Sequence, residues 1–229
     1  MDSRIIVARY NEDIKWLNEF TNHKITIYNK GEKVKNNNFS EIIDLKNVGR
    51  ESHTWLYHIV KNYYQLNEIN IFLQGSIDDL GCMAYQNPDE YLIDINKYGF
   101  STSRFGLLGP LHWDWNVGIE KDQRYKDQWL NNQISKSNIG FRAFAKELFP
   151  DIPIFVSTSY GGCFAVKKEK IQTYSIKYYK KLLNIMSKHK NPIEGHYMER
   201  LWCYMFTKNK PLIESINDVI KTKLENFLL

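Results

Sequence analysis

The feature that most constrains this sequence is the alternation of short apolar runs with helical patterns over its first 75 residues. Runs rich in branched apolar residues occur at Arg4–Ala8, Lys24–Tyr28, Glu41–Leu45 and Asn70–Leu73. Between the last two, residues 51–64 repeat apolar side chains at helical spacing. Strands that alternate with helices need crossover connections. The pattern therefore predicts an α/β fold with a mixed, mainly parallel sheet flanked by helices.

The second half of the chain is less regular. It predicts long loops over residues 85–118, a pair of strands around Gly161-Gly162, and helices over residues 169–187 and 191–208. No repeat or Pro-rich linker divides the chain, and its 229 residues fit one α/β core. We therefore expect a single domain over residues 1–229.

Composition narrows the function classes. The net charge of +5 comes from 31 basic and 26 acidic residues that are spread along the chain, which does not favour a nucleic-acid interface. It allows a weak peripheral attraction to anionic lipid or to a phosphorylated substrate. The three cysteines form no Cys-x-x-Cys pair, and no signal peptide or 20-residue apolar span occurs. We expect a cytoplasmic protein with no transmembrane segment.

Polar residues follow the predicted strands, where open parallel sheets bind ligands. Arg9, Tyr10, Asn11 and Asp13 come after the first strand, and such side chains can contact a nucleotide whose phosphates lie at a helix N-terminus. The alternative is that Asn11 or Asp13 only caps the next helix.

Two further strand ends carry charged residues. Arg50 precedes the strongest helix and can clamp a diphosphate, or it can simply pair with Glu51. Asp78 and Asp79 follow the strand that ends at Gln74 and offer oxygen ligands for Mn²⁺ or Mg²⁺, or form a solvated acidic turn.

The later segments suggest an acceptor side. Trp113 and Trp115 offer stacking faces around Asp114, which is a candidate general base, although both rings can equally belong to the core. Paired glycines at Gly161-Gly162 allow close backbone approach to a ligand, or form a hairpin bend or bulge.

Two glutamates lie in the last predicted helix. Asn191-Pro192-Ile193-Glu194 has the form of a capping-box start, and this local role competes with a catalytic role for Glu194. Glu199 lies beside the apolar stripe of that helix, where it faces a cleft or pairs with a lysine.

Taken in order, these motifs resemble a family of proteins of unknown function related to glycosyltransferases of the GT-A fold. The matching segments are residues 7–13, Trp16-Leu17, residues 49–54, residues 71–75, residues 162–166 and residues 198–202. The resemblance implies a nucleotide-sugar site in which Arg9, Tyr10, Asn11, Asp13, Arg50, Gln74 and Gly75 bind the donor. It implies that Gly162 and Phe164 line the acceptor side and that Glu199, Glu194 or Asp114 acts as the base.

Gln74 and Gly75 stand where metal-dependent relatives carry Asp-x-Asp, a motif that this sequence lacks. The resemblance therefore leaves two options, a transferase that uses Mn²⁺ or Mg²⁺ and one in which Arg50 or a lysine neutralises the leaving diphosphate.

The expected activity is transfer of a sugar from a nucleotide-diphosphate donor to a glycan, lipid-linked or protein acceptor. One rival is a non-catalytic carbohydrate-binding or scaffold protein on the same fold. The other is a nucleotidyltransferase or phosphotransferase, which would need clustered carboxylates for two metals.

Overall fold

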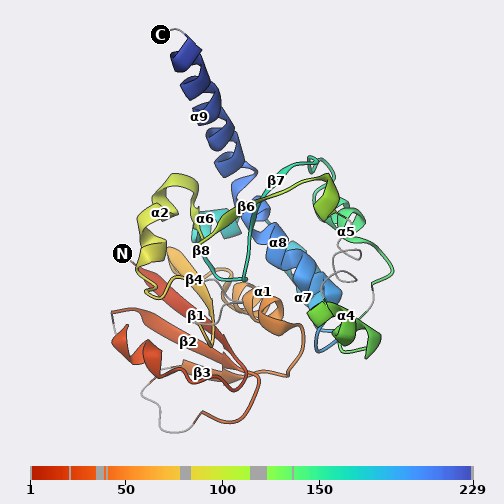
Figure 1. The fold of residues 1–229 in the computed structure, drawn as a ribbon. Coiled ribbons are helices and arrows are strands. Elements are labelled where there is room, and N and C mark those ends of the chain that lie inside the picture. Colours follow the sequence, from red (N-terminus) through yellow and green to blue (C-terminus); the bar gives the residue numbers. More distant parts are fainter. Residues whose placement is uncertain are drawn as a thin grey trace.

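The computed structural model describes residues 2–20, 22–34, 39, 41–77, 84–113, 123–135 and 137–227 (Figure 1). Its strands are β1 (Ser3–Arg9), β2 (Lys24–Asn29), β3 (Glu41–Asp44), β4 (Ile69–Gln74), β5 (Phe100–Ser101), β6 (Phe105–Leu108), β7 (Val156–Ser159) and β8 (Phe164–Lys167). Its α-helices are α1 (Arg50–Asn62), α2 (Glu90–Tyr98), α4 (Gln123–Leu130), α5 (Phe141–Leu148), α6 (Lys168–Ile171), α7 (Ile176–Met186), α8 (Ile193–Thr207) and α9 (Lys210–Phe227). Two 3-10 helices are η1 (Lys15–Glu19) and η2 (Pro110–His112).

The main sheet has six strands in the order β3-β2-β1-β4-β8-β5. The first four are parallel, with Ile5 of β1 opposite Ile25 of β2 and Ile71 of β4. β8 runs antiparallel to β4 and β5. The predicted α/β fold with a mainly parallel sheet is confirmed.

Both faces of the sheet are buried, which explains why its strands are continuous apolar runs. On one face Ile5 and Val7 pack with residues of η1 and α2. On the other, Ile6 joins a larger core built from α1, α7 and α8 (Figure 1). Side chains alternate across a strand, so consecutive residues of β1 serve different cores.

The segment predicted as long loops contains α2, β5, β6 and η2 instead. The predicted strands around Gly161-Gly162 exist, but β7 pairs with β6 in a separate two-stranded sheet while β8 joins the main sheet. Gly161 and Gly162 have φ angles of 84° and 69°. They therefore turn the chain from one sheet to the other rather than closing a hairpin.

The helix boundaries also differ from expectation. The helix expected after the first strand is the short η1, and the helix expected over residues 169–187 is divided into α6 and α7, with Ser175 capping α7. The last expected helix is followed by α9. Lys208 and Asn209 have φ angles of 51° and 65°, so α8 ends there and α9 begins anew. In the parts of the chain that the structure describes, no helix combines the length and apolarity needed to cross a bilayer.

Candidate functional site

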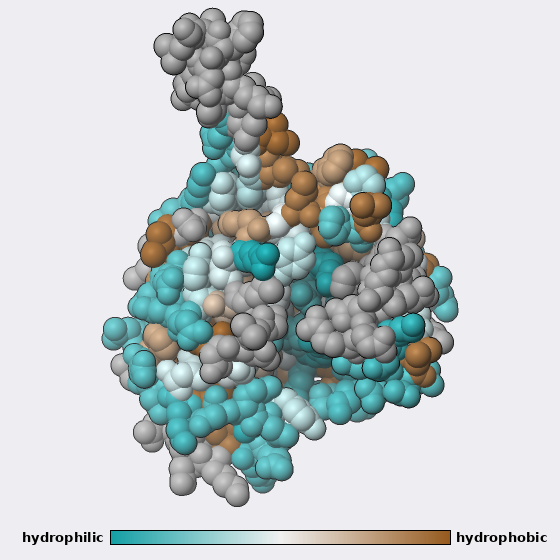
Figure 2. All heavy atoms as spheres, in the orientation of Figure 1, coloured by the Kyte–Doolittle hydropathy of each residue, from teal (hydrophilic) through white to brown (hydrophobic). Residues whose placement is uncertain are grey.

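A cavity of about 700 Å³ lies where the order of the main sheet reverses. The chain passes from β1 outward to β2 and β3, and then returns across β1 to β4 on its other side. Open α/β sheets bind ligands at the carboxyl ends of strands at such a switch point. Figure 2 shows a hydrophilic hollow in this region, between the sheet and the side of the molecule that carries α4. The described residues that line the cavity are Ala8, Arg9, Tyr10, Glu12, Lys30, Asn47, Arg50, Glu51, Gln74, Gln128, Asn132, Gln133, His189, Lys190 and Asn191.

The N-terminus of α1 forms one wall. Gly49 takes a left-handed conformation with φ 63°, and a Cβ there would lie 2.5 Å from the carbonyl oxygen of Met186. Arg50 follows with φ 49°, a conformation rare for a residue with a side chain. Because α1 has 13 residues, its first N–H groups and its dipole favour an anion at this wall.

The Arg50 guanidinium is held in place by neighbours on the same wall. Its Nη1 lies 3.2 Å from both ring nitrogens of His196, and its Nε lies 3.4 Å from the carboxylate of Glu51. His196 in turn donates from Nε2 to Oδ1 of Asn191 at 3.0 Å. Burial lowers the pKa of His196 well below its usual value, and Arg50 and Arg200 add to that effect, so the ring is neutral.

Lys30 is a buried cation in the cavity that the sequence analysis did not single out. Its ammonium donates to the carbonyl of Val48 at 2.7 Å and to that of Arg50. Burial lowers the pKa of Lys30 to about 7, and the Glu51 carboxylate opposes that shift. The sequence could have predicted this position of Lys30, because the residue follows β2, and β2 ends at the same edge of the sheet as β1.

The loop after β1 is organised by Arg9. Its guanidinium donates to the carbonyls of Tyr10, Glu12 and Glu32 and to Oδ1 of Asn29 at 2.6 Å. Arg9 lines the cavity, but its guanidinium is already hydrogen-bonded within the loop. Among the predicted donor-binding residues, Tyr10 also lines the cavity and is 46 % exposed.

Two further residues of this loop make local hydrogen bonds, although neither caps η1, whose N-cap is Ile14 with no side-chain cap. Asn11 accepts from the backbone N–H of Glu32 at 2.8 Å, and Asp13 accepts from that of Lys15 at 3.0 Å. Neither is among the described lining residues. The structure therefore gives Asn11 and Asp13 local roles.

Glu12, within the same motif, was not predicted. Its Oε2 accepts from the backbone N–H of Tyr10 at 2.6 Å. A Cβ on Gly75 would lie 2.7 Å from that oxygen, so the glycine makes room for Glu12. Gly75 contributes its carbonyl, which accepts from the indole of Trp16 at 2.9 Å.

Gln74 joins the cavity to the Gly161-Gly162 turn. Its amide donates to the carbonyl of Gly161 at 2.6 Å, and the N–H of Gly161 donates to Glu199 at 3.2 Å. Glu199 therefore contacts this turn and is not among the described lining residues. Gly162 packs on Glu51, since a Cβ there would lie 3.3 Å from Glu51 Cγ.

The end of β4 carries no carboxylate at Gln74 or Gly75. The side-chain amide N–H of Gln74 donates to the carbonyl of Gly161, and Gly75 has no side chain. Within the described ranges, no three His, Cys, Asp or Glu side chains gather around one point. Asp78 and Asp79 lie outside the described residues, so Mn²⁺ or Mg²⁺ binding there stays a prediction.

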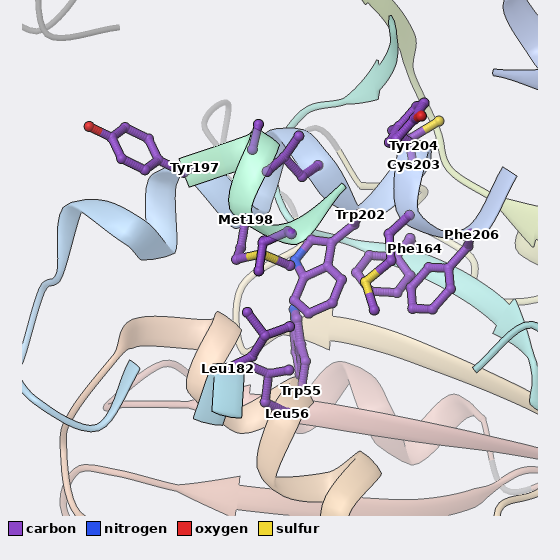
Figure 3. Close-up of a cluster of buried hydrophobic side chains, with 14 of the residues drawn as sticks. Trp55, Leu56, Phe164, Leu182, Tyr197, Met198, Trp202, Cys203, Tyr204 and Phe206 are labelled. Atoms are coloured by element: carbon purple, nitrogen blue, oxygen red, sulfur yellow. The ribbon is translucent and has the colours of Figure 1, made fainter. Parts of the chain in front are cut away.

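Two of the predicted acceptor residues belong to the core. Phe164 is fully buried and packs 5.6 Å from Trp202 and 6.1 Å from Phe206, measured between ring centroids (Figure 3). Trp113 is 7 % exposed, packs on Phe141 and donates to the carbonyl of Ile154 at 2.7 Å. The prediction that they bind an acceptor is wrong because their faces are already covered.

The remaining predictions fall elsewhere. α8 begins at Ile193 after Pro192, with no side-chain cap, so the predicted capping box is wrong. The Asn191 side chain accepts from His196 instead. Glu194 is in the first turn of α8 and is not among the described lining residues. Asp114 and Trp115 lie outside the described residues.

The structure adds a group of lining residues with amide side chains. Gln128 is in α4, and Asn132 and Gln133 are in the turn that follows it. Nothing in the sequence marks them, because no strand end or motif precedes them. They reach the cavity only through the tertiary fold.

Comparison with known proteins adds a family and no activity. A family model described as "Protein of unknown function (DUF3431)" matches residues 5–218. Neither the curated proteins nor the solved structures contain a match to this chain.

Proposed function

The chain belongs to a protein family of unknown function (DUF3431), and we propose from the site itself that it is a glycosyltransferase that binds a nucleotide-diphosphate sugar in this cavity. The proposal includes the GT-A fold that the sequence motifs resemble and a cytoplasmic location.

One observation carries the proposal: Lys30 and Arg50 meet at the N-terminus of α1 inside a switch-point cavity. A buried ammonium, a guanidinium and oriented N–H groups form a site for a dense negative charge. A diphosphate carries that charge, and its departure as a leaving group needs stabilisation of this kind.

Other lining residues suit the rest of a nucleotide. Tyr10 is half exposed at the cavity wall, and Lys190 lies 5.6 Å from its ring centroid. An aromatic ring beside a cation offers a stacking face for a nucleobase. The base would then lie against the β1 loop, while the diphosphate lies against α1.

The reaction follows from this placement. The bond between the anomeric carbon and the diphosphate oxygen breaks, and the diphosphate leaves with the electron pair. A bond forms between that carbon and an acceptor hydroxyl oxygen, and the hydroxyl proton passes to a carboxylate. Lys30 and Arg50 hold the diphosphate throughout.

Glu51 is the carboxylate that we propose as the proton acceptor. It lines the cavity and is buried beside Arg50 and Gly162, whereas Glu12 is bonded to the β1 loop. Glu199 accepts a hydrogen bond from the backbone N–H of Gly161 and is not among the described lining residues. We expect Glu51→Gln to lower the transfer rate at least a hundredfold with little change in donor affinity, and Glu199→Gln to change mainly stability. Equal losses of rate in both variants would contradict this assignment.

The first test is a thermal-shift screen against UDP, GDP, CMP, dTDP and their sugars, with and without Mn²⁺. A ligand at about 100 times its dissociation constant adds roughly 2.7 kcal/mol of stability. We expect a clear rise in melting temperature with one nucleotide class, and release of that nucleotide from its sugar when an acceptor is supplied. Binding of free sugars without any nucleotide would instead support a carbohydrate-binding protein.

A further inference from the structure

Three amide side chains form a distinct part of the cavity wall, here named the amide wall: Gln128, Asn132 and Gln133. They come from the end of α4 and the turn after it, whereas the cationic part comes from the loop after β2 and from α1. The cavity therefore has a cationic part at α1 and an uncharged polar part at α4.

The backbone of the amide wall is fixed. The N–H of Asn132 donates to the carbonyl of Trp129 at 3.1 Å, and the N–H of Gln133 donates to that of Gln128 at 2.8 Å. Ser135 then pairs with the loop before α8, donating to the carbonyl of Asn191 at 3.0 Å. These bonds fix the backbone from which the three side chains extend at the cavity.

The side chains themselves are unused. Within the described residues, the amides of Gln128, Asn132 and Gln133 make no hydrogen bond to the protein; Gln128 is half-buried, and Asn132 and Gln133 are exposed. Asn132 adopts φ 54°, a conformation that few residues with side chains tolerate. Each amide offers one acceptor oxygen and two donor hydrogens. A sugar hydroxyl is both donor and acceptor and is uncharged, so adjacent amides match adjacent hydroxyls.

We propose that the amide wall binds the hydroxyl groups of the donor sugar, and so determines which sugar the enzyme accepts. This inference rests on the proposed function. The diphosphate at α1 anchors the nucleotide, and the sugar attached to it extends toward α4.

The test compares a nucleoside diphosphate with its sugar conjugate, for example UDP with UDP-glucose or GDP with GDP-mannose, by calorimetric titration. The variant is Gln128→Ala, Asn132→Gly and Gln133→Ala combined. Glycine is used at position 132 because alanine would be strained at φ 54°. The matched control is Asn131→Ala, an exposed neighbour that is not among the described lining residues.

We expect the triple variant to bind the nucleotide sugar at least about tenfold more weakly, the effect of losing one or two net hydrogen bonds, and the free nucleotide within about twofold of wild type. The melting temperature and the control should match wild type. Equal weakening of both ligands, or no change in either, would overturn the inference and leave the proposed function standing. Failure of the wild-type protein to bind any nucleotide would overturn both.

Discussion

At the scale of single residues, Lys30 is the group whose chemistry depends most on the fold. An exposed lysine keeps its proton to about pH 10.4. Burial under the start of α1 lowers the pKa of Lys30 to about 7. The side chain therefore changes charge near neutral pH, inside the cavity where we place a diphosphate.

The lowered pKa of Lys30 makes the stability of the fold and the affinity for a diphosphate depend on pH in opposite directions. Between pH 7 and about 10.5 the unfolded chain holds a proton on this lysine that the folded protein has largely lost, so stability rises with pH in that window. A diphosphate that needs the ammonium must restore that proton, so its affinity falls over the same window. Melting curves and titrations at pH 6.5, 8 and 9.5 should show both trends in wild type and neither in Lys30→Met. Parallel curves for the two proteins would refute this account.

Arg9 and Arg50 provide a matched pair of arginines with different roles. Arg9 makes four hydrogen bonds that fold the loop after β1, so Arg9→Ala should lower the free energy of unfolding by about 1–3 kcal/mol. Arg50→Ala should cost less stability and weaken nucleotide diphosphate binding at least tenfold. Denaturation and titration of both variants check this. A larger stability loss for Arg50→Ala than for Arg9→Ala would be inconsistent with these roles.

The sequence predicted some of these residues and missed others for physical reasons. Arg9, Tyr10 and Gln74 follow strands, so their place at the carboxyl edge of the sheet is visible from the strand pattern alone. Glu12 was overlooked because its role depends on the space that Gly75 leaves, which no local pattern reveals.

At the scale of elements, the Gly161-Gly162 turn decides how the two sheets meet. The strands on either side were visible in the sequence, but their partners were not, because pairing depends on the distant β4 and β6. A pair of glycines fits a hairpin and a crossover equally well. Both kinds of connection accept the positive φ angles of these glycines, so only the tertiary contacts of the flanking strands distinguish a hairpin from a crossover.

Gly162→Ala tests the importance of this turn. A Cβ at φ 69° is strained and would lie 3.3 Å from Glu51 and 3.5 Å from Gln74. We expect a loss of about 1–3 kcal/mol in unfolding free energy and weaker nucleotide binding as the two side chains shift. The control is Gly140→Ala, where φ is −71° and no atom lies within 4 Å of the new methyl. It should stay within about 0.5 kcal/mol of wild type. Equal stability of the two variants in urea denaturation would contradict the prediction.

At the scale of the whole molecule, the sequence predicted the sheet better than the cavity. The order of apolar runs gave the parallel strands and α1, because burial on both faces leaves a strong local pattern. The far wall, built by α4 and the loop before α8, comes together only when α8 packs on the sheet core. No local sequence pattern predicts that α4 and the loop before α8 come together.

The core also predicts sensitivity to acid. Burial lowers the pKa of His53 to about 4 and that of His58 to about 3, and it lowers the pKa of His196 as well. The unfolded chain binds these protons near pH 6.5, so the folded state loses stability as the pH falls from 6.5 toward 4. Melting temperatures from pH 7.5 to 4.5 should fall, and less steeply in His53→Phe, which removes one buried imidazole. A flat wild-type profile would contradict this.

We propose that the cavity binds a diphosphate through Lys30 and Arg50. The most direct test is calorimetric titration of a nucleoside and of its diphosphate into wild type and into the Lys30→Met, Arg50→Ala double variant. We predict that wild type binds the diphosphate at least a hundredfold more tightly than the nucleoside, and that the double variant loses most of this difference. Equal affinity for the two ligands in wild type, or an unchanged difference in a folded double variant, would contradict the claim.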